Sequence, residues 1–84
     1  MREEGDFIFG DEEAMEAVRK FEDSLRRRKG VFLDVVDFER VVDYYLSADD
    51  HKKASDAVSA ALKIYPNSIE MQVRKAEVLI VEKR

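Results

Sequence analysis

Two helical segments between Asp34 and Ser68, each with its own start and stop signals, restrict the fold of this chain most strongly. In the first segment, apolar residues recur at spacings of three and four, so they lie on one face of a helix. They are Val35, Phe38, Val41, Val42 and Tyr45. Asp34 can accept hydrogen bonds from the free N–H groups of the first turn, whereas Asp49-Asp50 favours a turn. The pattern predicts a helix over 35–48.

The second segment lies between His51 and Pro66 and carries several small residues on its apolar face. This face is formed by Ala54, Ala57, Val58, Ala61, Leu62 and Tyr65. Small residues let another helix approach closely. Pro66 lacks an N–H group and disfavours helical geometry in the residue before it, while Asn67 or Ser68 can cap a following helix. We therefore expect a helix over 51–65, antiparallel to the first.

Several residues of this hairpin follow the order known from one family of helical repeats. Tyr45, Ala54, Ala61 and Pro66 match the family pattern, and Val58 occupies its usual aromatic position. With these residues, the segment 35–68 resembles a tetratricopeptide repeat, a helix-turn-helix unit of about 34 residues.

The segment also departs from the family pattern at three places. Phe38 stands where the family usually has Trp, Asp49-Asp50 replaces the commoner Gly-Asp turn, and Val42 occupies the position of a small residue. The resemblance covers less than half of the chain, and it implies a fragment of an α-solenoid.

The resemblance also implies a function, which is protein–protein interaction without chemistry of its own. In this family, the first helices of successive repeats line a groove that holds a peptide or a partner helix. Carried over to this chain, the groove would be lined by Val36, Glu39, Arg40, Asp43, Ser47, Glu70, Val73, Arg74 and Glu77. Glu39 and Asp43 stand where some members use Lys and Asn to bind a C-terminal carboxylate. Carboxylates there repel an acidic tail, so we expect a basic or amphipathic partner.

The composition agrees with an all-α domain of about four helices. Among 84 residues, 45% are hydrophobic and 40% are charged, with one Pro and three Gly, which favours a few long helices over many short strands. The absence of Cys excludes disulfides and cysteine-ligated metals and fits a reducing compartment. No apolar run reaches the length that spans a bilayer. We expect a cytoplasmic protein that does not enter a membrane.

The sequence predicts an N-terminal arm over residues 1–10 and a helical domain over residues 11–84. Asp11 is a candidate N-cap for a helix over 11–29. Its expected inner face is Ala14, Ala17, Val18, Phe21 and Leu25, which align at an offset of 40 with the second helix of the repeat. This helix thus resembles the back half of a degenerate repeat. Phe7, Ile8 and Phe9 either pack against it or form an arm that reaches another chain.

The connection between residues 26 and 34 is basic at first and then apolar. The run Arg26-Arg-Arg-Lys29 offsets the helix dipole, and Gly30 is a candidate for the left-handed residue that ends the helix. Four basic residues in a chain of net charge −4, with acidic residues on either side and no aromatic stacking platform, do not indicate nucleic-acid binding. Val31, Phe32 and Leu33 are expected to fill the space between helices.

The C-terminal segment predicts a fourth helix, over 69–83. Its apolar period is Ile69, Val73, Ala76 and Ile80, and Met71, Val78, Leu79 and Val81 add apolar surface nearly all round. The helix resembles the first half of a following repeat. Its apolar surface needs cover, either from the rest of a longer repeat protein or from self-association through this helix.

Residues suited to catalysis or metal binding are few. His51 lies beside Asp49 and Asp50, but there is no second His, no Cys and no glycine-rich phosphate loop. The two aspartates lack the spacing of a calcium loop, and pairs such as Asp34 and Asp37 are typical of helix caps. The sequence predicts no catalytic, cofactor or metal site.

Overall fold

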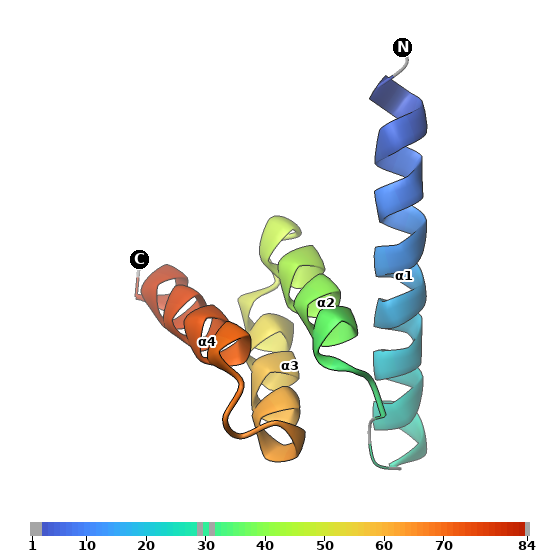
Figure 1. Cartoon of the computed structure of the whole chain (residues 1–84). Coiled ribbons are helices and arrows are strands. Elements are labelled where there is room, and N and C mark those ends of the chain that lie inside the picture. The colour runs from blue at the N-terminus through green and yellow to red at the C-terminus, as the bar shows by residue number, and fades with distance from the viewer. Residues whose placement is uncertain (1–2, 29, 31, 84) are drawn as a thin grey trace.

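The computed structural model describes residues 3–28, 30 and 32–83, with side chains from residue 12 onward. The chain is all-α, with four helices and no strand in this described part (Figure 1). The helices are α1 (Glu3–Arg27), α2 (Val35–Ser47), α3 (His51–Ile64) and α4 (Ile69–Glu82). The sequence predicted this fold class, and the bounds of the last three helices lie within one residue of those expected.

Side-chain caps explain why these three helices begin where they do; a cap was predicted at Asp34 and at Asn67 or Ser68, whereas Asp50 was expected only as part of a turn. The side chain of Asp34 accepts from the Asp37 amide at 2.9 Å, and Asp50 accepts from the Lys53 amide at 3.2 Å. Ser68, not Asn67, caps α4 by accepting from the amide of Met71 at 3.1 Å. Each cap satisfies a backbone donor that has no partner inside the helix.

Helix α1 is longer than the sequence indicated, because it begins at Glu3. Asp11 therefore lies inside the helix, and its expected role as N-cap is wrong. Gly5 and Gly10 each disfavour a helix by about 1 kcal/mol, so the sequence did not favour this extension. Each residue added to a formed helix gains a backbone hydrogen bond, and this allows growth past such residues. The side chains of Phe7, Ile8 and Phe9, and hence their expected contacts, lie outside the described residues.

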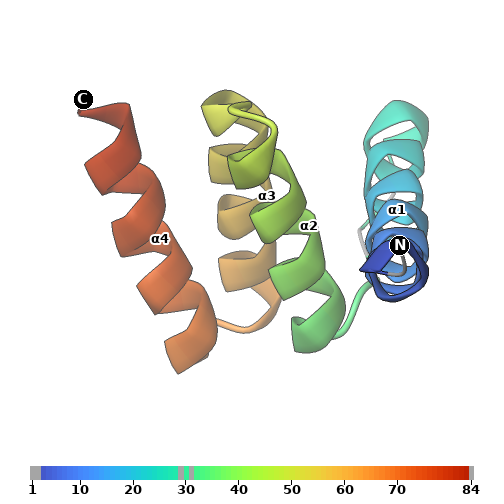
Figure 2. The same ribbon diagram turned by 90° about the horizontal axis from the view of Figure 1, so that it is seen from above.

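The four helices stand side by side, with α2 in contact with the other three. Helix α1 packs on α2, α3 packs on α2 as its antiparallel partner, and α4 packs on both α3 and α2. Seen from above, α1 and α4 form the two ends of this row (Figure 2). The first turns of α1 extend beyond the other helices (Figure 1).

The core is built from aromatic residues of α1 and α2, from Tyr65 directly after α3, and from alanines of α3. The ring of Phe21 meets Phe38 and Tyr45 edge-on at 6.4 Å between centroids, and Phe38 meets Tyr65 at 6.3 Å. Such edge-to-face pairs add to the gain from burial. The fully buried Cβ atoms of the α3 alanines let the helix axis come close to these rings. These alanines are Ala54, Ala57 and Ala61.

The connection between α1 and α2 differs from expectation in two ways. Arg28, not Gly30, adopts the left-handed conformation (φ 58°), because the last turn of α1 closes early, with the Arg28 amide donating to the carbonyl of Leu25. Of the expected apolar plug, Leu33 is buried but Phe32 is 93% exposed, and Val31 lies outside the described residues. The backbone of Leu33 is held by a residue outside this connection, because the Tyr65 hydroxyl donates to the Leu33 carbonyl at 2.8 Å.

The inner face of α1 also differs in part from the one predicted. Leu25 was expected in the core but is 53% exposed, and with Phe32 and Ile64 it lines an open depression beside α3. In α4, for which the sequence selected no inner face, Met71 and Val78 form the core side, and the apolar period noted in the sequence is exposed. Its exposed members are Ile69, Val73, Ala76 and Ile80. Apolar residues occur all round this helix, so periodicity alone could not select the buried face.

Candidate functional site

The nine predicted groove residues are shared between two neighbouring helices. Five come from α2 and four from α4, and these helices pack against each other. We call this region the α2–α4 surface. It consists of Val36, Glu39, Arg40, Asp43, Ser47, Glu70, Val73, Arg74 and Glu77. Packing thus brings together two stretches that are about thirty residues apart in the sequence.

An ion pair between Asp43 and Arg74 joins the two halves of the surface. The guanidinium donates through Nε and Nη2 to the two carboxylate oxygens, both at 3.0 Å. Burial alone lowers the pKa of Arg74, but its hydrogen bonds to Asp43 and the nearby charges of Asp43, Glu39 and Glu77 outweigh burial and raise the pKa. The arginine charge is therefore permanent and is balanced within the protein.

The second arginine of the surface, Arg40, is directed toward α1. Its guanidinium lies 3.0 Å from a carboxylate oxygen of Glu13 and 3.1 Å from one of Asp37. With Glu16 and Lys20, these residues line a shallow polar depression between α1 and α2. The sequence reading missed Glu13, because nothing in the sequence showed which turn of α1 would lie beside Arg40.

The remaining residues give the surface its acidic and apolar character. Within the described part of the chain, Glu39 and Glu77 form no ion pair. Val36 and Val73 are 51% and 47% exposed, one on each helix. The hydroxyl of Ser47 is engaged locally, since it donates to the carbonyl of Tyr44 at 2.9 Å. With both arginines paired, carboxylates and valines are the groups left for a ligand.

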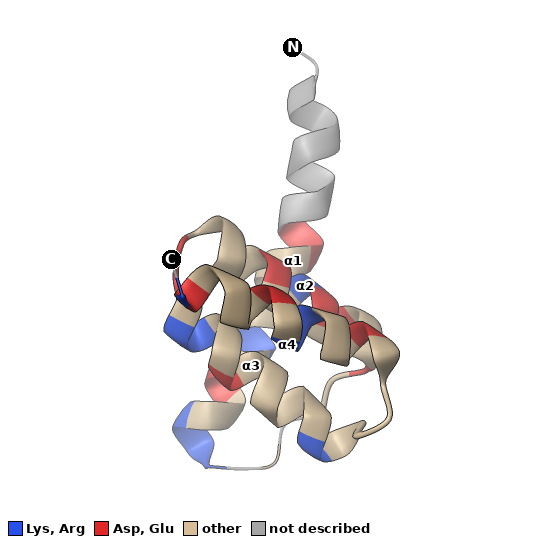
Figure 3. Ribbon diagram, turned by 90° about the vertical axis from the view of Figure 1, so that its left-hand side faces the viewer, with Lys and Arg blue, Asp and Glu red and all other residues tan. Residues whose placement is uncertain are grey.

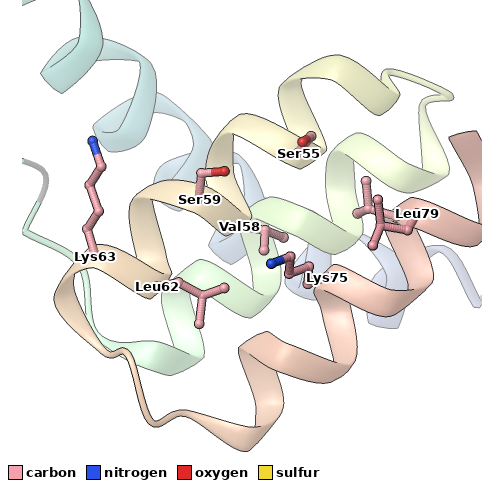
Figure 4. A pocket seen from close by; sticks show the side chains of 8 residues that line it. Ser55, Val58, Ser59, Leu62, Lys63, Lys75 and Leu79 are labelled. Carbon is pink, nitrogen blue, oxygen red and sulfur yellow. The ribbon is translucent and has the colours of Figure 1, made fainter.

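A second concavity lies between α3 and α4, with a volume of about 310 Å³ (Figure 4). Its floor is apolar, and Lys75 extends from α4 across it toward α3. The lining residues are Ser55, Val58, Ser59, Leu62, Lys63, Lys75, Val78 and Leu79. The sequence did not indicate this groove, because its residues come from two helices whose packing no local pattern specifies.

A polar cluster inside the helical row serves to join helices. The Tyr45 hydroxyl of α2 donates to the carboxylate of Glu22 on α1, and Lys53 of α3 places its ammonium 3.6 Å from the same carboxylate. Burial first, and then the hydrogen bond and the negative charge of Glu22, raise the pKa of Tyr45 above its usual value. The cluster therefore links α1, α2 and α3.

The other residues considered for chemistry lie at the surface. His51 Nε2 is 3.5 Å from a carboxylate oxygen of Asp49, and that aspartate side chain is 91% exposed. Among the described residues, no three His, Asp or Glu side chains gather in a way that could hold a metal ion. Over the same residues, no helix combines the length and the apolar character needed to cross a membrane.

No protein-family model matches the chain, and no curated protein or solved structure matches it significantly.

Proposed function

We propose that this chain is a non-enzymatic scaffold of the tetratricopeptide-repeat type, which binds a peptide or a partner helix on the α2–α4 surface. The buried positions of the family pattern support the proposal, because Tyr45, Ala54 and Ala61 all lie in the core. The pairing of α2 with α3 and the packing of α4 on both helices are further features that such a repeat requires.

The observation that carries the proposal is the imbalance of charge on the α2–α4 surface. Asp43 balances Arg74, and Glu13 and Asp37 balance Arg40, so neither arginine is free to bind an acidic ligand. Free carboxylates remain beside two exposed valines. A basic amphipathic segment fits this surface, because its cations would meet Glu39 and Glu77 while its apolar side chains cover the valines.

The acidic and apolar character of the α2–α4 surface suggests the class of partner, and the proposal also includes a cytoplasmic location. A segment with Lys or Arg on one side of an apolar stripe is the expected ligand class. A chain without Cys is suited to a cytoplasmic location, where thiols stay reduced.

The proposal can be tested with two designed peptides of equal length and equal apolar content. One carries Lys and the other Glu at every polar position, and binding is followed by fluorescence anisotropy at low salt. We expect the Lys peptide to bind more tightly, and Glu39→Lys to weaken its binding about fivefold to tenfold, because one attractive charge becomes repulsive. Raised salt should reduce the difference between the peptides.

The matched control is Glu12→Lys, which makes the same charge change at an exposed position on α1. Its net charge equals that of Glu39→Lys, so a general effect of charge on the whole protein would appear equally in both variants. Equal binding of the two peptides, or unchanged affinity in Glu39→Lys, would contradict the proposal.

A further inference from the structure

The most prominent apolar feature of the surface is a stripe along the outer side of α4. We define the α4 stripe as Ile69, Val73, Ala76 and Ile80. Its three large members are 73%, 47% and 62% exposed in chain order. Figure 3 views the molecule from this side, where α4 lies at the end of the helical row. Large apolar side chains exposed together on one side of a helix are typical of a protein-binding face.

The spacing within the α4 stripe is that of a two-stranded helical seam. Successive members are four, three and four residues apart, the alternation of the core positions of a heptad repeat. Val73 and Ile80 then occupy the first core position of the heptad, where β-branched residues are common in parallel pairs, and Ile69 and Ala76 occupy the second, where two-stranded pairs usually have Leu. The helix therefore offers the spacing of a short helical seam to a second copy of itself.

The edges of the stripe differ in charge, and this difference selects an orientation. Glu70 and Glu77 flank one edge, whereas Gln72 and Leu79 flank the other. In an antiparallel pair, like edges meet, so Glu70 would face Glu77 of the partner subunit. In a parallel pair, unlike edges meet, so Glu77 would face the uncharged Gln72 of the partner subunit instead of a second carboxylate. The charges thus favour the parallel arrangement.

We propose that two copies of this chain pair through the α4 stripe, with their α4 helices parallel about a two-fold axis. Between residues 12 and 27, where its side chains are described, α1 is unsuited to the same role, because its exposed residues there are mostly charged. The proposal goes beyond the scaffold function, although Val73 of the stripe and Glu77 at its edge also belong to the α2–α4 surface. The residues that test the dimer, Ile80 and Gln72, lie outside that surface.

The size of the stripe sets the expected strength of the pair. Helix α4 has 14 residues, which is two heptads, so the contact is smaller than a standard interface of about 20–30 residues on each side. We therefore expect a weak dimer, with a dissociation constant on the order of 10–100 μM. Measurements must reach several hundred micromolar to detect it.

The first test is sedimentation equilibrium of the intact chain and of Ile80→Asp. Two aspartates facing each other across a seam repel and lose the apolar contact, so the dissociation constant should rise more than a hundredfold. Since Ile80 is 62% exposed, the fold of the monomer should survive, and circular dichroism checks this. Phe32→Asp is the matched control, because Phe32 is 93% exposed in the α1–α2 connection and should not affect the dimer.

The second test checks whether the two α4 helices are parallel by placing a positive or a negative charge at position 72. Gln72→Lys should tighten the dimer about threefold to tenfold, since each new ammonium would face Glu77 of the partner subunit, and Gln72→Glu should weaken it by a similar factor. Near the start of α4, Glu favours the helix and Lys does not, so effects on monomer stability run in the opposite direction.

Three results would overturn the proposal. These are a monomer throughout the concentration range, a dimer that persists in Ile80→Asp, and equal effects of Lys and Glu at position 72. Loss of the dimer in Phe32→Asp would also overturn it, by assigning the contact to the α1–α2 connection. Peptide binding measured on monomeric Ile80→Asp reports on the scaffold function separately, so the two proposals can fail independently.

Discussion

The two ends of the helical row are built in opposite ways. Apart from Met15 and Leu25, every fully exposed side chain of α1 between residues 12 and 27 is charged. Helix α4 instead exposes five apolar side chains along its length. They are Ile69, Val73, Ala76, Leu79 and Ile80. Charged faces are well solvated, whereas a continuous apolar face lowers its free energy by contact with protein. The α4 end is therefore the side of the molecule suited to assembly.

The inner faces of the two end helices differ as well. Helix α1 is held by Phe21, which touches two aromatic rings of α2, and by the hydrogen bond of Glu22 with Tyr45. Helix α4 is held by Met71 and Val78, with the exposed ion pair of Arg74 and Asp43 at the edge. Aromatic contacts bury more area than aliphatic ones, so α1 should be attached more firmly than α4.

The largest effect is expected from Phe21→Ala. The side chain is 1% exposed, and its removal leaves a cavity between α1 and α2. We expect the free energy of unfolding to fall by about 3–5 kcal/mol, as measured by urea unfolding at low micromolar concentration. A loss below about 1 kcal/mol would mean that α1 is not anchored by this ring.

A smaller effect is expected from Met71→Ala at the opposite end. Met71 is fully buried, but the sulfur-containing chain is flexible and its neighbours belong to an end helix that can relax. The same urea experiment should give a loss of about 2–4 kcal/mol. If Met71→Ala proved more destabilising than Phe21→Ala, the order of attachment of the two end helices would be reversed.

The smallest expected change in stability comes from the polar cluster of Glu22, Tyr45 and Lys53, which links α1, α2 and α3. The raised pKa of Tyr45 means that the unfolded chain releases the phenol proton more easily than the folded one. This contribution to stability is complete below pH 10 and is lost as the pH rises above 10, by at most about 1.4 kcal/mol per pH unit. Urea unfolding between pH 9 and 11 should show it. In Tyr45→Phe the free energy of unfolding should fall less over this pH range. An equal fall in both proteins would show that the Tyr45 hydroxyl does not cause the loss.

Much of the fold could be predicted from local signals in the sequence. Asp34, Asp50 and Pro66 act within one turn of their own positions, so the bounds of α2 and α3 did not depend on distant residues. The start of α1 was missed because its glycines gave a local signal against a helix that the rest of the segment outweighed. The exposure of Phe32 was missed because adjacent apolar residues in a connection cannot all face inward, and only packing decides which one does.

The candidate site was predictable only as two separate sets of positions. The sequence named Asp43 and Arg74, but it gave no sign that they would bind each other across 31 residues. It also gave no sign that Arg40 would pair with Glu13 on α1. These pairs change the surface from mixed charge to one on which the free groups are acidic. The resemblance to a tetratricopeptide repeat and the binding function stay predictions.

The sequence by itself determined the all-α class, the hairpin of α2 and α3 and the caps that delimit three helices, because these depend on interactions within a few residues. The tertiary structure alone decided which side of α4 is buried and which arginines are neutralised. On a helix that is apolar nearly all round, every face can pack. The choice of Met71 and Val78 depends on the shape that α2 and α3 present together.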